Sequence, residues 1–560
     1  MIPHPASPPI TAEMQFLLLC SRKDTTGEQA ERIFALAGQP LDWQAIVTAA
    51  GDHHTSQLVS WHVEHICPQA MPPVWNQYLR NEFQRILRRN LMLSAELLRV
   101  LDAFQSAGVL AIPYKGPGLT ALAYGNLALR EFGDLDLLIA HDDIHRAIQA
   151  VLDLGYQTHA RVTGHKRSGE PVPGQYLFWR DHDRYLVELH TERTLRYFPK
   201  VLPVAKLQQR LQRVSVGGRD VFTLGIDDLL NFLCVHGSKH FWNRLQWIAD
   251  IAELVDGGLI PDLGPALARG DELGSRRMLL LGLRLADEIL GAKIPETIRQ
   301  EYHRDPAINS MSAQVREIIF AERVMLPGIA QRMKFRMKMT GSVTQGLRYG
   351  FRLATAPTEE DWLGTKLPRV LTPLYALLRP FRLLGKYGAG LKQRVAPDLA
   401  PFVPTPDDIA RRMLELADFT SNDVLYDLGC GDGQIVVTAA REFGARCVGV
   451  DVDPQRIAEA RAHARSAGVE HLVTLIHDDV RHVDLSPATV VTLYLTIPGN
   501  AKLWTQLNQQ LRPGARIVSR DSDMPGWHED KLVEMDTPDR MHTTLHLWHI
   551  GAISPAARPS

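Results

Sequence analysis

Three glycines and two aspartates between residues 424 and 454 have the types and spacing to hold a nucleoside. An apolar run with β-branched residues ends at Asp427, a helix-periodic segment spans 434–443, and a second apolar run, 446–450, ends at Asp451. The glycines between the first run and the helix are Gly429, Gly431 and Gly433. Glycines let the backbone approach a ligand, a helix N-terminus faces it, and a terminal acid accepts hydrogen bonds from ribose hydroxyls. The stretch therefore predicts a strand–turn–helix–strand unit that binds a nucleoside.

The glycine spacing separates two classes of nucleoside ligand. A dinucleotide turn has the pattern G-x-G-x-x-G around a pyrophosphate, whereas this chain has G-x-G-x-G after an acid, in DLGCGDG. An acid at the strand end suits a ligand that carries a sulfonium and an ammonium, because opposite charges attract. The stretch resembles motif I of class I S-adenosylmethionine-dependent methyltransferases. The resemblance implies that Asp427 and the three glycines hold the methionine part of S-adenosyl-L-methionine, Asp451 the ribose, and Asp479 the adenine amino group.

A second set of acids has the spacing of a divalent-metal site. Asp134 and Asp136 alternate in EFGDLDLLIA, which predicts a strand with both carboxylates on one face. Like charges held so close repel each other unless a cation lies between them. RYLVELH predicts another strand, with Glu188 and His190 on one face. The two aspartates therefore indicate a divalent-metal site, for which Glu188 is available as a third acid.

Cations precede these acids in the chain. Lys115 and Gly116 follow a short apolar strand, 109–113, and Arg130 lies between them and the acids. This order resembles the uncharacterised nucleotidyltransferase family of bacteria, within the superfamily that includes polymerase β. The resemblance implies that two magnesium ions and a nucleoside triphosphate bind at Asp134, Asp136 and Glu188, with Lys115, Gly116 and Arg130 at the phosphates. The alternative is a nucleotidyltransferase-like domain that only recruits a substrate, and metal binding distinguishes the two.

Histidines occur in two further groups. His236 and His240 lie one turn apart in a predicted helix pair, without the glutamate of a zinc-protease helix. The surrounding KHFWNRLQWIAD is typical of the same nucleotidyltransferase family, and both a core role and a role in lining the cleft stay open. The group between residues 53 and 67 completes no metal set and predicts surface histidines, in an N-terminal region of about 100 residues that is predicted to be helical.

Composition limits the architecture and the compartment. A chain of 560 residues with 22% charged residues predicts a globular protein of two to four domains. It has no apolar run long enough for a membrane span, and its N-terminus lacks the regions of a signal peptide. Five scattered cysteines without a CxxC pair favour a reducing compartment. We therefore expect a cytoplasmic protein.

Charge divides the chain into two parts. Residues 401–560 contain 15 Lys or Arg and 22 Asp or Glu, a balance of −7, so the remainder carries +6 of the total of −1. Residues 311–395 interleave cations with aromatic and apolar residues, which indicates a solvated helix face or, alternatively, weak contact with a membrane surface of anionic lipid or with RNA. We predict a nucleotidyltransferase-like domain in 1–395, a proline-rich linker in 396–406 and a methyltransferase domain in 407–550.

The part from residue 401 to 550 resembles bacterial relatives of the family 173 methyltransferases, which are similar to protein lysine methyltransferases. The expected folds are both α/β: an α+β nucleotidyltransferase-like domain with helical flanks, then a doubly wound, Rossmann-like sheet. An amine acceptor, a protein lysine, is favoured by the net charge and by acids at the expected substrate opening, Asp478, Asp479, Asp521 and Asp523. A small-metabolite acceptor is the alternative. Duplex nucleic acid is disfavoured as the methyl acceptor, because binding it requires cations that neutralise its phosphates, whereas residues 401–560 are acidic overall.

Overall fold

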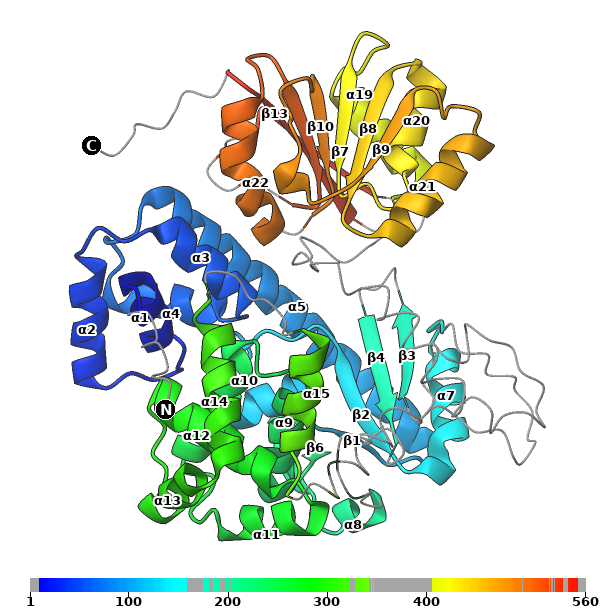
Figure 1. Cartoon of the computed structure of the whole chain (residues 1–560). Helices are drawn as coiled ribbons and strands as arrows, with labels where there is room; N and C mark the ends of the chain where they lie inside the picture. Colours follow the sequence, from blue (N-terminus) through cyan, green and yellow to red (C-terminus); the bar gives the residue numbers. More distant parts are fainter. Residues whose placement is uncertain are drawn as a thin grey trace. The chain divides into compact units, whose positions relative to one another are not determined.

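The chain forms two compact units, residues 1–392 and 393–560, in a computed structural model (Figure 1). The structure describes residues 10–158, 175–180, 185–191, 198, 200, 204–321, 328–341, 344, 346, 405–495, 497–522, 524, 527, 529–536 and 542–551. Most of the basic segment after residue 341, the predicted linker up to residue 404, and Asp523 lie outside these residues. Among the described helices, none combines the length and the apolar composition needed to cross a membrane.

The first unit begins with a helical subregion, as the sequence predicts. Thr11, Thr26 and Asp42 each accept a hydrogen bond from a backbone N–H of the helix that follows, which fixes three of its starts. The histidines in this subregion are not all on the surface: His53 is 2% exposed and His62 is 3% exposed, so the surface prediction is wrong for both. The helices are α1 (Ala12–Leu19), α2 (Gly27–Ala37), α3 (Trp43–Asp52), α4 (Ser56–Ile66) and the long α5 (Pro73–Ser106).

A four-stranded sheet follows, in the order β1-β2-β4-β3. Its central strands β2 and β4 are parallel and pair Asp136 with Glu188. Alternation along β2 turns Leu135, Leu137 and Ile139 toward a hydrophobic cluster shared with α5 and α7. Asp136 therefore lies on the opposite face of the sheet. The elements are β1 (Ala111–Pro113), β2 (Leu135–Ile139), α7 (Ile144–Asp153), β3 (Gln175–Arg180) and β4 (Tyr185–His190).

Helices of the later part of this unit complete its main hydrophobic core, together with α1, α3 and α4. Trp242, fully buried, lies between α9 and α10 and contacts Gly237 and Gly282 closely. The remaining elements are α6 (Gly116–Leu119), the π-helical turn η1 (Thr120–Tyr124), the 3₁₀ turn η2 (His141–Asp143), α8 (Val204–Gln208), β5 (Gln212–Val216), β6 (Arg219–Thr223), α9 (Ile226–Lys239), α10 (Leu245–Asp256), α11 (Gly264–Leu273), α12 (Arg276–Leu290), α13 (Glu296–Arg304), α14 (Pro306–Ile319) and α15 (Ile329–Lys338).

The second unit is a doubly wound sheet of seven strands in the order β12-β13-β11-β10-β7-β8-β9, which confirms the predicted fold class. Strands β7 to β11 are parallel, and β13 is antiparallel to β11 and β12. The elements are α19 (Asp407–Leu416), β7 (Val424–Leu428), α20 (Gln434–Phe443), β8 (Arg446–Asp451), α21 (Pro454–Ser466), β9 (Val473–His477), η5 (Val480–His482), β10 (Val490–Leu493), α22 (Ile497–Gln510), β11 (Arg516–Arg520), β12 (Lys531–Asp536) and β13 (His542–His549).

Each face of this sheet has its own core. Leu425 on β7 belongs to a cluster with α19, α20 and α21, whereas its neighbour Tyr426 belongs to a cluster with Leu503 and Leu507 of α22. Figure 1 shows these helices covering the two faces. Since the order of the strands reverses between β7 and β10, the carboxyl ends of these two strands mark the switch point where ligands bind in such folds.

Candidate functional site

The predicted glycine turn connects β7 to α20 in a conformation that other residues adopt at a cost. Gly429, Gly431 and Gly433 have φ angles of 88°, 54° and 81°, in the left-handed region that favours glycine. A Cβ on Gly433 would lie 2.8 Å from the Cβ of Ala460, and one on Gly429 would lie 2.9 Å from a methyl of Leu495. The turn is therefore specified by glycine on both conformational and steric grounds.

Asp427 ends β7 beneath this turn as a buried carboxylate with little compensation. Among the described contacts, its partner is the hydroxyl of Thr492 on β10, which donates to Oδ1 at 2.8 Å. Burial, with a smaller contribution from the nearby Asp451 and Asp432, raises the pKa of Asp427 to about 7, against the Thr492 hydrogen bond. A buried carboxyl surrounded by other acids fits a cationic ligand group, which supplies the missing counter-charge. S-adenosyl-L-methionine carries such groups, so the residues present fit it.

Asp451, at the end of β8, tightens the glycine turn. Its carboxylate accepts a hydrogen bond from the N–H of Gly431 at 2.9 Å and another from the N–H of Asp453 at 2.8 Å. Each carboxylate oxygen has a second acceptor site, so the predicted ribose contact is compatible with both bonds.

Asp479, predicted at the adenine, caps the short η5 turn. Its carboxylate accepts from the backbone N–H of Arg481 at 3.0 Å and from Nε of the same residue at 2.7 Å. Burial opposes the charged carboxylate, but the Arg481 bonds outweigh it and lower the pKa of Asp479. An adenine contact at Asp479 stays a prediction and requires it to share these oxygens with Arg481.

The acids expected at the substrate opening are tied to their own surroundings. Asp478 accepts from the N–H of Asp479 at 2.7 Å, and Asp521 accepts from the N–H of Thr544 at 2.9 Å. Asp521 also lies 3.2 Å from Nε of Arg520, a side chain only 2% exposed. The Arg520 guanidinium stacks on the Tyr494 ring, 4.3 Å from its centroid. The sequence analysis missed this stacked pair, which follows β10 and ends β11.

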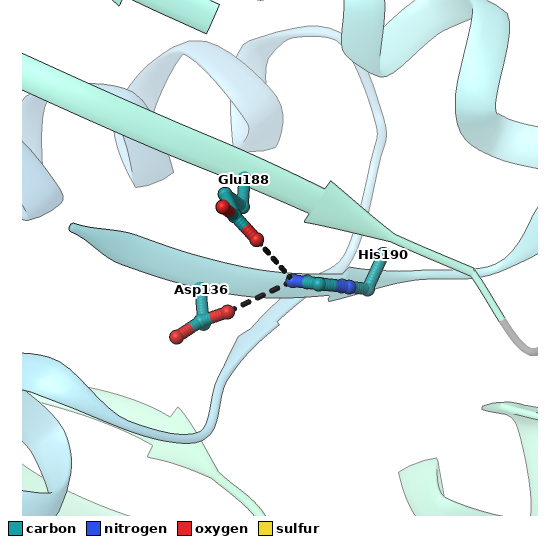
Figure 2. Close-up of side chains that lie close together, drawn as sticks. All are labelled: Asp136, Glu188 and His190. Atoms are coloured by element: carbon teal, nitrogen blue, oxygen red, sulfur yellow. Dashed lines mark hydrogen bonds and ion pairs between the residues drawn. The ribbon is translucent and has the colours of Figure 1, made fainter. Parts of the chain in front are cut away.

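The acids of the first unit meet as the register of β2 and β4 requires. Asp136, Glu188 and His190 offer ligand atoms that all lie within 4.8 Å of one another (Figure 2). Nε2 of His190 lies 2.8 Å from Oδ1 of Asp136 and 3.2 Å from Oε2 of Glu188. Asp134 lines the same cavity. Asp136 and Glu188 supply the carboxylate oxygens that magnesium prefers, so these two residues fit the implied metal. Asp134, also predicted as a ligand, is not among the described residues whose ligand atoms meet here.

Charges in this cluster depend strongly on one another. Burial and the neighbouring Asp136 raise the pKa of Asp134 to about 6. Burial also opposes charge on Asp136, but Lys115 and His190 hold the pKa of that carboxyl well below its usual range. His190 gains bonds to two carboxylates that outweigh its own burial, and its pKa is raised. The cluster thus balances its negative charge with cations from the protein.

The predicted cations have different roles in the structure. Lys115 donates to Oδ2 of Asp136 at 3.0 Å, and Gly116 takes a φ of 55° beside the backbone of Asp134. Arg130, by contrast, directs its Nε and Nη2 at Asp250, at 2.7 and 2.8 Å, and is 5% exposed. Tyr124, in the π-helical turn, also donates to Asp250 at 3.0 Å. These contacts make Arg130 a structural anchor at the cavity edge, and its predicted role toward phosphates stays untested.

A cavity of about 870 Å³ opens in front of the carboxylates. His236, His240 and Trp247 line it, which favours the cleft-lining interpretation of that motif, and the described ring pairs have centroids 4.7 to 5.3 Å apart. Burial lowers the pKa of His236 well below its usual range and that of His240 to about 3, so both imidazoles are neutral near pH 7. Asp250, the last residue of the motif, is the partner of Arg130. The motif therefore builds one wall of the cavity.

Comparisons with known proteins match the two units separately. Residues 39–291 match the model of the family described as "Uncharacterised nucleotidyltransferase", and residues 427–531 match the "ANTKMT methyltransferase domain". A protein-lysine N-methyltransferase of Saccharolobus islandicus is 40% identical over 152 residues, 27% of this chain and 94% of the relative. An adenine nucleotide translocase lysine N-methyltransferase of Mus musculus is 35% identical over 110 residues, 20% of this chain and 48% of the relative.

Among solved structures, an RNA methyltransferase from Salinibacter ruber in complex with S-adenosyl-L-homocysteine is 46% identical, with a TM-score of 0.26, over 28% of this chain and 97% of that one. Both lysine methyltransferase relatives correspond to less than a third of this chain. Through its second unit the chain belongs to the S-adenosylmethionine-dependent methyltransferases of the ANTKMT domain family, and it joins that domain to a nucleotidyltransferase-like one.

Proposed function

We propose that the second unit transfers a methyl group from S-adenosyl-L-methionine to an amine, a lysine side chain of a protein. The observation that carries the methyl-donor part is Asp427, a buried carboxyl beside the glycine turn to which the described residues offer no cation. The acceptor part is supported by the names of the relatives, which are protein lysine methyltransferases. The chain's net charge of −7 over residues 401–560 favours a cationic acceptor surface.

The methyl donor supplies a methyl group bonded to a positive sulfur, which is already a good leaving group. Residues of the protein then need mainly to align the acceptor and to exclude water. Asp427 and Asp451 would hold the donor, while Tyr494 and Arg520 lie at the ends of neighbouring strands. An ammonium has no lone pair, so the acceptor lysine must lose its proton before it reacts. Activity should therefore rise between about pH 7 and 9.

The test is a labelling experiment on the full chain. Purified protein and methyl-labelled S-adenosyl-L-methionine are incubated with a cell extract, and labelled products are separated into protein, RNA and small molecules. Label in protein that survives acid hydrolysis as methyl-lysine supports the proposal. Label confined to small molecules or to RNA contradicts the lysine acceptor but not the methyltransferase assignment.

For the first unit we propose magnesium-dependent transfer of a nucleotide to a hydroxyl. Asp134, Asp136 and Glu188 would hold the metal, which supplies charge neutralisation at the phosphates. In this reaction the acceptor oxygen forms a bond to the α-phosphorus, the bond to pyrophosphate breaks, and the hydroxyl proton is released to water. Support comes from the convergence of Asp136 and Glu188 in a large cavity that Asp134 also lines. Isotopic exchange of labelled pyrophosphate into nucleoside triphosphates, with and without magnesium, tests it.

One observation favours a second candidate for this unit, a domain that recruits a ligand without catalysis. Asp136 is already neutralised by Lys115 and His190, at 3.0 and 2.8 Å, so its charge needs no metal to be stable. Under this candidate the methyl acceptor is a small metabolite. A titration with magnesium or manganese separates the two candidates, because a recruiting domain shows no saturable metal binding at millimolar concentration.

A further inference from the structure

The lining of the cavity is rich in arginine. Four guanidinium groups reach it from three parts of the first unit: Arg89 from α5, Arg244 before α10, and Arg332 and Arg336 from α15. Arg332 and Arg336 are one helical turn apart and so lie on one face of α15. These four residues are called the arginine wall below.

Within the part of the chain that the structure describes, no carboxylate lies at ion-pair distance from the arginine wall, although Glu131, which lines the same cavity, attracts Arg89 and Arg244 from further away. The polar contact that Arg89 makes there is with the carbonyl oxygen of Gly133, at 3.3 Å. Arg244 and Arg336 rest on aromatic rings, with their guanidinium carbons 5.4 Å from the Trp247 centroid and 5.6 Å from the Phe241 centroid. Nε of Arg336 is buried without a hydrogen-bond partner. In the described residues, Arg244, Arg332 and Arg336 thus have no hydrogen-bond acceptor in the cavity.

Burial makes this lack of acceptors costly to the empty protein. It lowers the pKa of the guanidinium groups of Arg89 and Arg244, against the more distant attraction of Glu131 and Asp134. The neighbouring imidazoles of His236 and His240 are neutral and offer no negative charge. Uncompensated buried charge is retained in proteins mostly where a ligand supplies the counter-charge.

A strained turn holds the wall in place. Phe241 and Trp242, between α9 and α10, have φ angles of 60° and 51°, a left-handed conformation that costs about 1–3 kcal/mol for each such residue. Trp242 fills the space beside Gly237, where an added Cβ would lie 2.6 Å from its ring. Phe241 then contacts Phe335 of α15, with ring centroids 5.2 Å apart. The turn therefore fixes both Arg244 and the helix that carries Arg332 and Arg336.

We propose that the arginine wall is an anion subsite beside the metal-binding carboxylates, which holds the phosphate group of a small phosphorylated acceptor. Four planar guanidinium forks suit the several oxygens of a phosphate dianion better than a carboxylate. The cavity volume is near the upper end of the range of about 300–1,000 Å³ for ligand pockets, which gives room for a second ligand beside a nucleotide. The acceptor role rests on the proposed nucleotide transfer, whereas anion binding itself does not.

The experiment measures the binding of two probes to the full chain by calorimetry. The first probe is inorganic pyrophosphate with EDTA, which tests the wall without metal. The second is ATP with magnesium, which tests the carboxylates. The variants are Arg332→Gln/Arg336→Gln, Arg332→Gln alone and Asp136→Asn. The control is Lys334→Gln, which removes one positive charge, as Arg332→Gln does, from an exposed residue of the same helix.

We expect pyrophosphate to bind the wild type and to bind the double arginine variant about tenfold or more weakly, since each lost bond is to a charged group. Lys334→Gln should match the wild type. Asp136→Asn should lose magnesium-dependent ATP binding and keep pyrophosphate binding, and the arginine variant should show the reverse. If the double variant unfolds, Arg332→Gln alone, on a partly exposed residue, carries the same comparison.

Three results would overturn the subsite. The wild type does not bind pyrophosphate, Lys334→Gln weakens binding as much as the arginine variant does, or the arginine variant loses both probes together. The last result means that the wall holds the phosphates of the nucleotide itself. Pyrophosphate binding without any magnesium-dependent ATP binding in the wild type leaves the subsite standing and refutes the proposed nucleotide transfer.

Discussion

Asp427 is the residue on which the methyltransferase site depends most directly. With a pKa of about 7 it is only partly ionised in the empty protein at neutral pH, because burial and two neighbouring acids oppose its charge. Thr492 donates the hydrogen bond that favours the ionised form. A bound cation would shift the balance further to the carboxylate, so ligand binding and ionisation are coupled.

The first prediction concerns the pH dependence of cofactor affinity. The affinity for S-adenosyl-L-methionine should rise as the pH increases from about 5 to 7, by up to about tenfold per unit, and level off above 7. Asp427→Asn should bind weakly with little dependence on pH in this range. Calorimetric titration of both proteins at several pH values measures the effect, and equal slopes for the two would remove Asp427 from the binding site.

The same carboxyl has an opposite effect on the stability of the empty protein. Its folded pKa of about 7 exceeds the ordinary value of about 3.9 for unfolded chains, so between these two values the folded state binds more protons. The free energy of unfolding should therefore fall as pH rises through this window, by about 1.4 kcal/mol per pH unit from this group. Urea unfolding of wild type and Asp427→Asn isolates the contribution as the difference between two slopes.

Substitutions at Thr492 test whether its hydrogen bond sets the pKa of Asp427. Thr492→Val removes the donor and keeps the shape, so it should raise the pKa of Asp427 and move the rise in cofactor affinity to higher pH. Thr492→Ser keeps a hydroxyl and should leave the midpoint unchanged. An unchanged midpoint in the valine variant would show that the hydrogen bond does not tune this carboxyl.

In the first unit, replacing Asp136 distinguishes a catalytic nucleotidyltransferase from a domain that only recruits a ligand. Asp136→Asn should abolish magnesium-dependent nucleotide binding, because it removes the charge of a carboxylate that would hold the metal. Lys115 and His190 contact the same carboxylate. Asp142→Asn, an exposed acid of the same unit, is the control and should have no effect. Circular dichroism checks that the fold persists. Wild-type affinity in the Asp136 variant would leave the unit as a scaffold.

At the scale of elements, helix α20 has a glycine at each end, and the two glycines differ in how tightly their surroundings are packed. Gly433 and Gly444 bracket the helix, and both have left-handed φ angles, 81° and 67°. A Cβ on Gly433 would clash with Ala460, whereas a Cβ on Gly444 would meet nothing within 4 Å. The first position is restricted by conformation and packing, the second by conformation alone.

This difference in packing predicts that alanine costs less stability at Gly444 than at Gly433. Gly444→Ala should cost about 1 kcal/mol of stability and leave cofactor binding intact. Gly433→Ala should cost about 2–4 kcal/mol, because the overpacked Cβ adds to the conformational strain, and should also weaken S-adenosyl-L-methionine binding by moving the turn. Thermal unfolding with and without the cofactor compares the two, and equal losses would mean that the clash is relieved at no cost.

These elements also show what one sequence can predict. The glycine turn, Asp427 and Asp451 are within thirty residues, and local spacing was enough to place them. The meeting of Asp136 with Glu188 followed from alternation on two strands. The pairing of Arg130 with Asp250, 120 residues apart, and the Thr492 bond to Asp427, 65 apart, depend on which elements become neighbours. The burial of His53 and His62 was missed for the same reason, since it depends on how distant helices pack.

At the scale of the whole molecule, the chain contains two sets of cores. In the described residues, each hydrophobic cluster draws its members from one unit: three end at or before Met339, and two begin at or after Ile409. Each unit therefore has the apolar burial that independent folding requires.

A chain divided after Pro397 should give two soluble, folded pieces. The C-terminal piece should bind S-adenosyl-L-methionine with the affinity of the full chain, and its thermal transition alone should shift upward when the cofactor is added. Calorimetric scans of the full chain and of both pieces measure this. A single shared transition in the full chain, with aggregation of both pieces, would mean that the units are not independent.

The buried carboxyl of Asp427 below the glycine turn should also contribute to the measured enthalpy of cofactor binding. Because the empty protein keeps a proton on Asp427 below pH 7, binding that favours the carboxylate must release that proton into the buffer. Near pH 6 this amounts to roughly 0.9 proton per molecule, and near pH 8 to roughly 0.1. The measured enthalpy should then depend on the ionisation enthalpy of the buffer at pH 6, and much less so at pH 8. The number of protons released to the buffer would thus report the binding of the methyl donor.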